Sequence, residues 1–240
     1  MKYQFIHSTR EHPSMGYTLY INLFEDKTCT LDCFWCSFGK TKLKTDTRTS
    51  FFPVSDVLKE ISSFIDTVHQ PESIFILSKG ESVLYADLGQ LINDIKNKYP
   101  DVKIGIWTNA TLLAQKEIRG ELALCDYVTA DLNVTNEADF IKLHKPVESI
   151  IFANVVKGLD QFSKEYKGFL TISITFLKDF NDSEENLDGL RQQLESISPK
   201  EIIVNFRKER NTEALEKKFV DLLKKKFKGL PYKITLQELH

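Results

Sequence analysis

The sequence predicts an α/β fold with a mostly parallel sheet. Short runs rich in β-branched and aromatic residues alternate with amphipathic stretches of helical period along the chain. Strands that alternate with helices pair in parallel through right-handed crossovers, so an α/β barrel and a doubly wound sheet are the two alternatives. The apolar character of the strands suits burial on both faces. We therefore expect six strand–helix units and a last strand.

The expected elements follow one another at short intervals. The strands are placed at 17–24, 73–78, 103–109, 127–134, 170–177, 201–206 and 233–239. The helices are placed at 53–68, 85–99, 111–124, a long region ending near 166, 183–197 and 212–227. Pro53 suits the start of the first helix, and Asp182 or Ser183 can cap the fifth. Without a repeat or a linker, residues 1–240 are expected to form one domain, with a lead-in over 1–16 and a C-terminal helix and strand over 211–240.

Composition narrows the class of protein. A chain of 240 residues with 42% hydrophobic side chains buries a substantial core without disulfides. The balance of 32 basic against 34 acidic residues gives no global reason to expect a membrane or nucleic acid partner, so nucleic acid is the less favoured partner. The N-terminus lacks an apolar signal core, and no run approaches the ~18 apolar residues of a membrane span. These features predict a cytoplasmic protein.

The cysteines are unevenly placed. Three of the four lie in CTLDCFWC, at Cys29, Cys33 and Cys36, and an odd cluster of thiols in a reducing compartment indicates metal binding or redox chemistry rather than a structural bridge. The cluster falls in a loop from about residue 25 to 52, after the first strand. Ligands bind beyond the carboxyl ends of parallel strands, and long loops in compact domains tend to be functional.

The ligand count limits the choice of metal. A structural zinc site needs four protein ligands, and Cys125 lies in a different unit, so zinc would be incompletely bound. Thiolates also suit iron–sulfur clusters, and three ligands on a cubane leave one iron open to a substrate. A non-catalytic electron-transfer protein, a zinc-binding protein and three incidental thiols are the alternatives. The missing fourth thiolate opposes the first two.

CTLDCFWC, with Trp35 beside the last cysteine, resembles the CxxxCxxC signature of the radical S-adenosylmethionine (SAM) superfamily. The resemblance implies that Cys29, Cys33 and Cys36 hold a 4Fe-4S cluster whose open iron binds SAM, and that Trp35 is a cofactor-binding residue. One-electron reduction by flavodoxin or ferredoxin would then cleave SAM to methionine and a 5′-deoxyadenosyl radical, which abstracts hydrogen from a substrate. It also implies a partial (β/α)6 barrel of radical SAM type, to which KITLQEL adds a C-terminal strand.

Two further segments extend the resemblance. SKGESVLY is similar to the family's glycine–glutamate segment, which implies that Gly80 and Glu81 lie at the amino group of SAM, although Lys79 replaces the first glycine of the usual pair. WTNATLL is similar to the Thr-Asn-Gly segment after the third strand, which implies a cofactor-binding role for Asn109.

The segments CSFGKT, ADLNVTNEADFIKLHKP and FLKDFNDSEENL resemble the wyosine-synthase-like iron–sulfur oxidoreductases. Wyosine synthases carry a second cluster on additional N-terminal cysteines, and no cysteine precedes Cys29, so the resemblance is to a single-cluster member. Asn133 stands where that branch has aspartate, and Asp131 lies two positions earlier on the same strand face. Either residue could bind ribose or substrate hydroxyls, or simply end a strand.

The favoured function is a radical SAM enzyme that acts on a small molecule or peptide: a sugar, a nucleoside or a peptide. The enzymatic alternative is a protein that activates a glycyl-radical enzyme. Cys125 fits a buried hydrophobe better than a hydrogen-atom donor. Basic residues at 40–48 could attract an anionic substrate or form a solvated loop, and Arg207, Lys208 and Arg210 could meet an anionic group at the open end of the barrel.

Overall fold

The computed structural model describes residues 3–207 and 213–239 and is built around one large sheet. The strands follow the order β1-β2-β5-β6-β7-β8-β9-β10, in which β1 is antiparallel to β2 and every other neighbouring pair is parallel. The strands are β1 (Ile6–His12), β2 (Gly16–Ile21), β5 (Ser73–Ile76), β6 (Lys103–Thr108), β7 (Tyr127–Asp131), β8 (Phe169–Phe176), β9 (Glu201–Arg207) and β10 (Lys233–Leu239). The expected mostly parallel α/β fold is confirmed.

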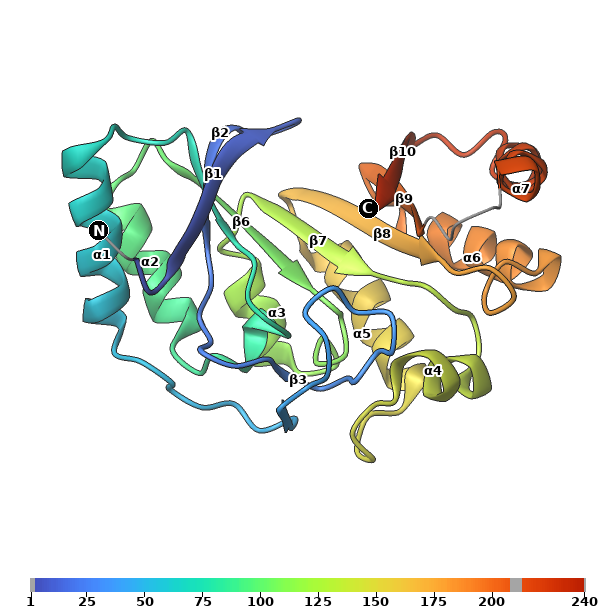
Figure 1. Ribbon diagram of the computed structural model, residues 1–240, viewed down its shortest axis with the longest axis horizontal. Coiled ribbons are helices and arrows are strands. Elements are labelled where there is room, and N and C mark those ends of the chain that lie inside the picture. Colours follow the sequence, from blue (N-terminus) through green and yellow to red (C-terminus); the bar gives the residue numbers. More distant parts are fainter. Residues whose placement is uncertain (1–2, 208–212, 240) are drawn as a thin grey trace.

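Most of the helices cover one face of this sheet, whereas α4 lies beyond the carboxyl ends of the strands (Figure 1). The helices are α1 (Val54–Thr67), α2 (Leu88–Lys98), α3 (Lys116–Leu122), α4 (Glu137–His144), α5 (Phe152–Glu165), α6 (Glu184–Ile197) and α7 (Glu213–Lys226), with a short 3-10 helix η1 (Ser82–Leu84). In α1 the buried residues Val57, Ile61 and Phe64 recur every three or four positions, so one stripe of the helix faces the sheet. The stripe packs with alternate strand residues such as Ile106 and Val128 in one continuous core.

The opposite face of the sheet forms the concave inner wall. Tyr20 and Phe75 pack there with Met15 in a second, smaller hydrophobic cluster. Distant strands meet at this wall, because Arg10 on β1 and Asn205 on β9 line the same cavity. Since five strands separate β1 from β9 in the sheet order, the sheet must curl strongly to bring these residues together. The curl is that of a partial barrel.

Two elements differ from the expectations. The segment 1–16, expected as a lead-in, contains β1, an edge strand paired with β2. The long helical region ending near 166 is two helices, α4 and α5. The break follows from Lys145-Pro146, because a residue before proline is disfavoured in the α conformation, and Lys145 adopts a left-handed φ of 46°. Ser183 caps α6 as expected, accepting a hydrogen bond from the Asn186 N–H.

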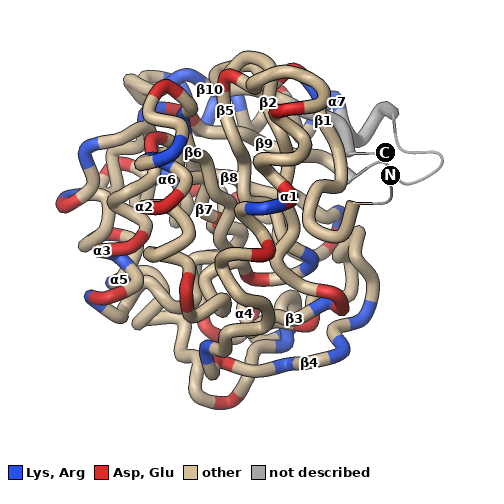
Figure 2. The backbone as a smooth tube through the Cα atoms, turned by 90° about the vertical axis from the view of Figure 1, so that its left-hand side faces the viewer, with Lys and Arg blue, Asp and Glu red and all other residues tan. Residues whose placement is uncertain are grey.

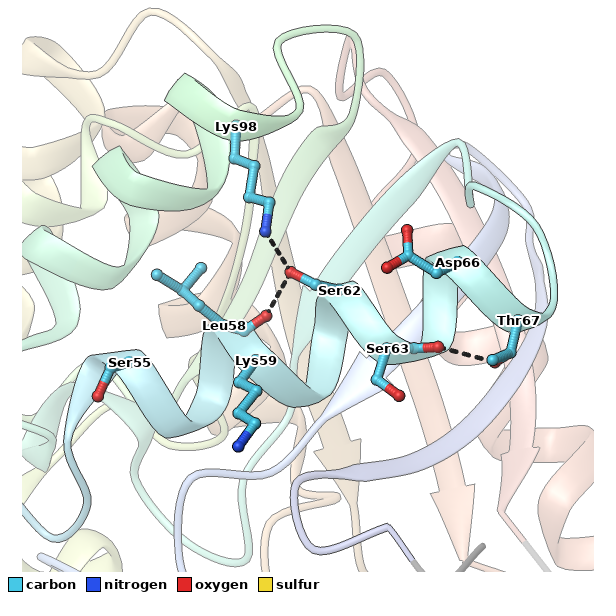
Figure 3. A pocket seen from close by; sticks show the side chains of 8 residues that line it. All are labelled: Ser55, Leu58, Lys59, Ser62, Ser63, Asp66, Thr67 and Lys98. Carbon is cyan, nitrogen blue, oxygen red and sulfur yellow. Dashed lines mark hydrogen bonds between the residues drawn. The ribbon is translucent and has the colours of Figure 1, made fainter.

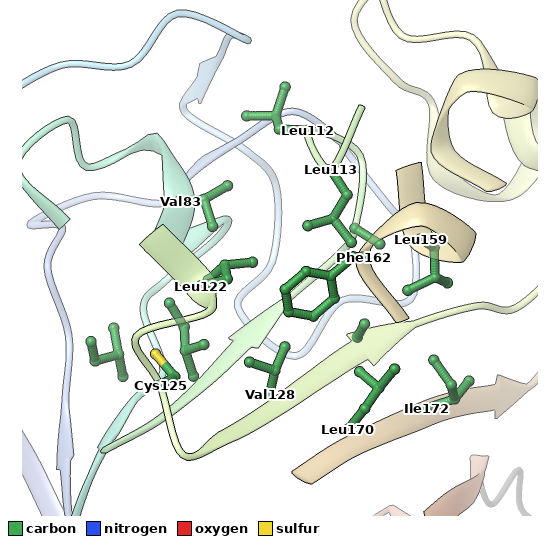
Figure 4. Close-up of a cluster of buried hydrophobic side chains, with 14 of the residues drawn as sticks. Val83, Leu112, Leu113, Leu122, Cys125, Val128, Leu159, Phe162, Leu170 and Ile172 are labelled. Carbon is green, nitrogen blue, oxygen red and sulfur yellow. The ribbon is translucent and has the colours of Figure 1, made fainter. Parts of the chain in front are cut away.

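Cys125 lies in the core beside α3, among Leu122, Val128 and Phe162 (Figure 4). Its side chain is 4% exposed, and burial raises the pKa of the thiol. A thiol that stays protonated in apolar surroundings behaves as a small hydrophobic group. The expectation of a buried hydrophobe is confirmed.

The loop that carries the other cysteines is attached to the sheet through its own two-stranded ladder. Strand β3 (Thr28–Cys29) pairs with β4 (Leu43–Lys44), and Thr28 also forms a parallel bridge to Gly80 at the carboxyl end of β5. The Thr28 N–H donates to the Lys79 carbonyl at 3.0 Å, and the Glu81 N–H donates to the Thr28 carbonyl at 2.9 Å. Cys29 is thereby fixed next to the end of a central strand.

Candidate active site

A cavity of about 440 Å³ opens at the carboxyl ends of the strands. The loop with β3 crosses this end of the sheet, and the arrowheads of β6 and β7 point toward it and toward α4 (Figure 1). The cavity wall includes all three clustered cysteines, Cys29, Cys33 and Cys36. The other lining residues used below are Arg10, Lys27, Trp35, Gly80, Trp107, Asn109, Asp131, Asn133, His144, Thr175 and Asn205.

The cysteine loop is closed by contacts between its ends. The Lys27 ammonium donates to the Gly39 carbonyl at 2.6 Å, and the Thr41 N–H donates to the Asp32 carboxylate at 2.8 Å. Between them, the Cys36 N–H donates to the Cys33 carbonyl at 3.2 Å in a tight turn. The loop therefore holds its own shape, which presents the sulfur atoms to the cavity without a disulfide.

Residues 144–147, at the end of α4, form a strap that binds the cysteine loop on the side away from β5. The Asp32 N–H donates to the His144 carbonyl and the Val147 N–H donates to the Thr30 carbonyl, both at 2.9 Å. The Lys44 ammonium also donates to the carbonyls of 145 and 146, each at 3.3 Å. The cysteine loop is thus held between the end of β5 and the end of α4.

Burial governs the protonation of two of the thiols, those of Cys29 and Cys33. Burial, with a smaller contribution from Glu81, raises the pKa of Cys29 to about 12, and burial also raises the pKa of Cys33. The Lys27 ammonium acts in the opposite direction on both thiols. Because metals bind thiolates, binding must release these protons, and the positive charge of Lys27 favours that release.

The donor set is three cysteine side chains around one cavity. Among the described residues, no group of three or more His, Cys, Asp or Glu side chains is arranged to hold a single metal ion. A 4Fe-4S cluster places each thiolate on a different iron, so three separate sulfur atoms around one cavity fit it. Cys29, Cys33 and Cys36 are the residues that would hold such a cluster.

Gly80 lies on the cavity wall, whereas the side chain of Glu81 does not. Gly80 lines the cavity with a φ of +125°, and a Cβ atom there would lie 1.8 Å from the Thr28 carbonyl oxygen. Glu81 is fully buried, and its carboxylate accepts from the backbone N–H groups of Val83 and Asn109. Burial raises the pKa of Glu81 to about 7 although these hydrogen bonds lower it. In this structure the Glu81 side chain joins two strand-end segments and is absent from the cavity wall.

Asn109 contacts the first cysteine. Its Nδ2 lies 3.5 Å from the Cys29 sulfur and 3.0 Å from the Thr30 hydroxyl, while its Oδ1 accepts from the Thr111 N–H at 3.1 Å. Since the backbone N–H can only donate, it fixes the amide with the oxygen toward Thr111 and the nitrogen toward Cys29.

Asn133 and Trp35 also line the cavity. Asn133 follows the end of β7, and its Oδ1 accepts from the Thr175 N–H at 2.7 Å. Its carbonyl accepts from the side chains of Asn181 and Asn186 at 2.9 and 3.2 Å. The asparagine cluster therefore holds the ends of β7 and β8 together. The Trp35 ring meets the His144 ring edge to face, with centroids 5.9 Å apart.

Several cavity residues were not assigned from the sequence. Arg10 comes from β1, which lacks an apolar alternation, and Trp107, Thr175 and Asn205 come from three separate strands. The sequence does contain a signal for Trp107, Thr175 and Asn205. Side chains along a strand alternate between the helix-covered face and the inner face, so these residues near the strand ends can be assigned to the inner face. Nothing in the sequence near the cysteines indicates His144, which lies 111 positions from Cys33.

Asp131 is an inner-wall carboxyl group that accepts from the Trp107 indole N–H at 3.0 Å. Burial raises the pKa of Asp131 to about 7, although hydrogen bonds from Trp107 and Ser173 lower it. An acid with a raised pKa binds more protons in the folded state, so the free energy of unfolding falls as pH rises from about 4 to about 7.

Asp131→Asn is therefore expected to reduce the fall in the free energy of unfolding with rising pH. The asparagine keeps a side-chain oxygen that can accept from the Trp107 indole N–H. The measurement is the free energy of unfolding in urea at pH 5 and pH 7.5, for the metal-free wild-type and variant proteins. Equal pH dependence in the two proteins would show that Asp131 is ionised in the fold at the lower pH.

The basic loop runs through β4, where Figure 2 marks its Lys and Arg positions in blue. Lys42 pairs with Asp26, and Arg48 binds the Glu121 carboxylate and the carbonyls of Val83 and Tyr85. These contacts favour a structural loop over an anion-binding one. The side chains of Arg207, Lys208 and Arg210 lie outside the described part of the chain.

A second hollow lies on the outer surface of α1, beside the end of α2, and Figure 3 shows its polar lining. The Lys98 ammonium donates to the Ser62 hydroxyl at 2.6 Å, and that hydroxyl donates to the Leu58 carbonyl at 2.7 Å. Neither cysteine nor histidine lines it. The cavity at the strand ends is therefore the candidate active site.

The family model of the Radical SAM superfamily matches residues 27–190, which include the cysteine loop and the carboxyl ends of β5, β6, β7 and β8. The chain belongs to the radical SAM superfamily. Members of this superfamily are enzymes that bind a 4Fe-4S cluster and SAM, so the resemblance from the sequence is confirmed at this level. None of the described helices has the length and apolar character that a membrane span requires.

Sequence relatives of this radical SAM chain include UPF0026 proteins. It is 26% identical to one from Synechocystis sp. over 74% of this chain and 65% of the relative, and 23% identical to one from Methanocaldococcus jannaschii over 80% and 60%. It is also 30% identical to a protein of Brachyspira hyodysenteriae named GTPase Obg, over 77% of this chain and 27% of that protein. The chain thus spans less than two thirds of the length of each of these relatives.

Solved structures share the radical SAM fold. A radical SAM methyltransferase from Sphaerobacter thermophilus has a TM-score of 0.66 at 13% identity, covering 96% of this chain and 68% of that protein. Archaeal TYW1 has a TM-score of 0.60 at 14% identity, covering 90% and 73%. At these identities the likeness shows the fold alone, and it supports the partial barrel with its mostly parallel sheet.

Proposed function

We propose that this chain is a radical SAM enzyme in which Cys29, Cys33 and Cys36 bind a 4Fe-4S cluster. The observation that carries the proposal is the position of all three sulfur-bearing side chains on one cavity at the carboxyl ends of the strands. Three protein ligands would leave one iron of such a cluster open. When bound, the cluster would supply the electron for reductive cleavage of SAM to a 5′-deoxyadenosyl radical that abstracts hydrogen from the substrate.

The protein's own residues shape and position the site for this chemistry. Gly80 brings the backbone of the β5 end against Thr28, so backbone groups lie beside Cys29 without an intervening side chain. Glu81 acts by holding the Asn109 N–H, and Asn109 in turn faces Cys29. Buried apolar residues such as Leu31 and Val134 exclude water from the same wall. A dry, shaped site protects a reactive radical from side reactions.

The inner wall suits a polar substrate. Asp131, Thr175 and Asn205 bring a carboxyl, a hydroxyl and an amide to the cavity from three adjacent strands. Such groups bind hydroxyl and amine groups, which sugars, nucleosides and peptides all carry. A small electron carrier such as flavodoxin or ferredoxin is the proposed reductant.

The deciding experiment is anaerobic reconstitution with iron and sulfide, followed by SAM and dithionite. We expect about four irons per chain and formation of 5′-deoxyadenosine. A protein with a verified intact cluster that forms no 5′-deoxyadenosine would refute the proposed function. A protein that instead bound one zinc ion tightly and no cluster would support the zinc-binding alternative.

A further inference from the structure

His144 lies against the second cysteine of the cluster motif. Its Nδ1 is 3.1 Å from the Cys33 sulfur, and the imidazole is 4% exposed at the end of α4. Phe140 packs against the ring at 5.3 Å between centroids, and Trp35 meets it edge to face. Two rings and the short α4 turn therefore hold the imidazole in one orientation, aimed at the sulfur.

The chemistry of the pair fixes the direction of this contact once a metal is bound. A thiolate that ligates iron carries no proton and can only accept a hydrogen bond. The proton between the two atoms must then belong to the imidazole, as Nδ1–H donating to sulfur. This selects one of the two neutral tautomers of His144.

The first cysteine has a similar neighbour. The Asn109 amide nitrogen faces the Cys29 sulfur at 3.5 Å, with its orientation fixed by Thr111. His144 and Asn109 lie 111 and 80 positions from the cysteines they contact, so the fold alone brings them there. Among the described residues, no comparable N–H donor to the Cys36 sulfur is present, so the surroundings of the three sulfurs are unequal.

We infer that His144 is a positioning residue that donates an Nδ1–H hydrogen bond to the Cys33 sulfur and raises the reduction potential of the cluster. The inference rests on the proposed ligation of a 4Fe-4S cluster by Cys33. A hydrogen bond to a ligand sulfur stabilises negative charge on the cluster, and the reduced state carries one more negative charge than the oxidised state. The reduced state therefore gains more from the bond.

The test uses cluster-loaded protein grown with ¹⁵N-labelled histidine. Pulsed electron paramagnetic resonance of the reduced cluster should detect one weakly coupled histidine nitrogen in the wild type. His144→Phe should lose this coupling and lower the midpoint potential. His144→Asn should lose the labelled nitrogen but keep the potential near that of the wild type, because the asparagine Nδ2 occupies nearly the place of the histidine Nδ1.

The matched control is His69→Phe. His69 is exposed and stacks on Tyr17 at 4.5 Å, outside the cavity wall, so coupling and potential should both be unchanged. A wild-type cluster with no histidine coupling would overturn the inference, as would a strong coupling typical of a direct iron–nitrogen bond. Equal potentials in wild type and His144→Phe, with four irons in each, would overturn it as well. Should His144→Phe fail to bind iron, the wild-type coupling and His144→Asn decide.

These outcomes separate the inference from the proposed function. Iron content and 5′-deoxyadenosine formation by the wild-type protein test the enzyme, whereas the nitrogen coupling and the potential test His144. A protein that cleaves SAM with no histidine near its cluster would keep the function and lose the inference.

Discussion

Replacing Cys33 by alanine is expected to abolish binding of an intact cluster and to lower 5′-deoxyadenosine formation by at least about 100-fold. Loss of a group that merely orients a ligand costs about 10- to 100-fold, and loss of a ligand should cost more. The same result is expected for Cys29→Ala and Cys36→Ala, since all three side chains line the cavity. Iron and sulfide content, together with the visible absorption of the cluster, measure the effect.

Cys125→Ala is the matched control for the cysteine variants. Cys125 lies in the core, away from the cavity wall, so this variant should keep its four irons while losing about 1 kcal/mol of stability from the small void. Normal iron binding by Cys33→Ala, or loss of the cluster in Cys125→Ala, would contradict the proposed ligand set.

Gly80→Ala is expected to destabilise the metal-free protein by more than about 3 kcal/mol. The new Cβ would lie 1.8 Å from the Thr28 carbonyl oxygen, and the φ of +125° strains any residue with a side chain. Backbone atoms cannot move aside as a flexible side chain can, so the bridge between Thr28 and Gly80 should open. Urea unfolding under anaerobic, reducing conditions measures the change in free energy.

Gly39→Ala separates backbone strain from steric conflict. Gly39 has a similar positive φ of +74°, but no atom lies within 4 Å of the Cβ position. This variant should lose only about 1–2 kcal/mol, the cost of the left-handed conformation. Equal losses for the two variants would mean that the close approach to Thr28 contributes nothing to stability.

Local patterns in the sequence were sufficient for most of the fold. The parallel strands are short apolar runs, and their places in the chain agree with the structure within a few residues. The sequence pattern does not predict β1, because IHSTREH is mostly exposed and has no apolar alternation. Only its pairing with β2 defines it as a strand. The break between α4 and α5 has a local signal in Pro146, which disfavours the α conformation at Lys145.

The candidate site also contains some residues that local sequence identifies and others that only the fold brings together. Local spacing identified the cysteines, and resemblance directed attention to Gly80, Glu81 and Asn109, although the Glu81 side chain turned out to bind strand-end N–H groups. The contacts of His144 and Asn109 with cysteine sulfurs could not be found locally. They depend on closure of chain segments of 111 and 80 residues, which only the folded sheet determines.

The strap formed by segment 144–147 gives the cysteine loop a second role. The loop is tied to this strap by the Asp32 and Val147 hydrogen bonds and to β5 by Thr28, so a ligand that tightens the loop also tightens the strap and the end of α4. Ligand binding to the native state alone suppresses local opening in proportion to its occupancy. On the proposed ligation, we expect proteases to cut this region more slowly in the cluster-loaded protein than in the metal-free protein, so that iron would protect the chain from degradation.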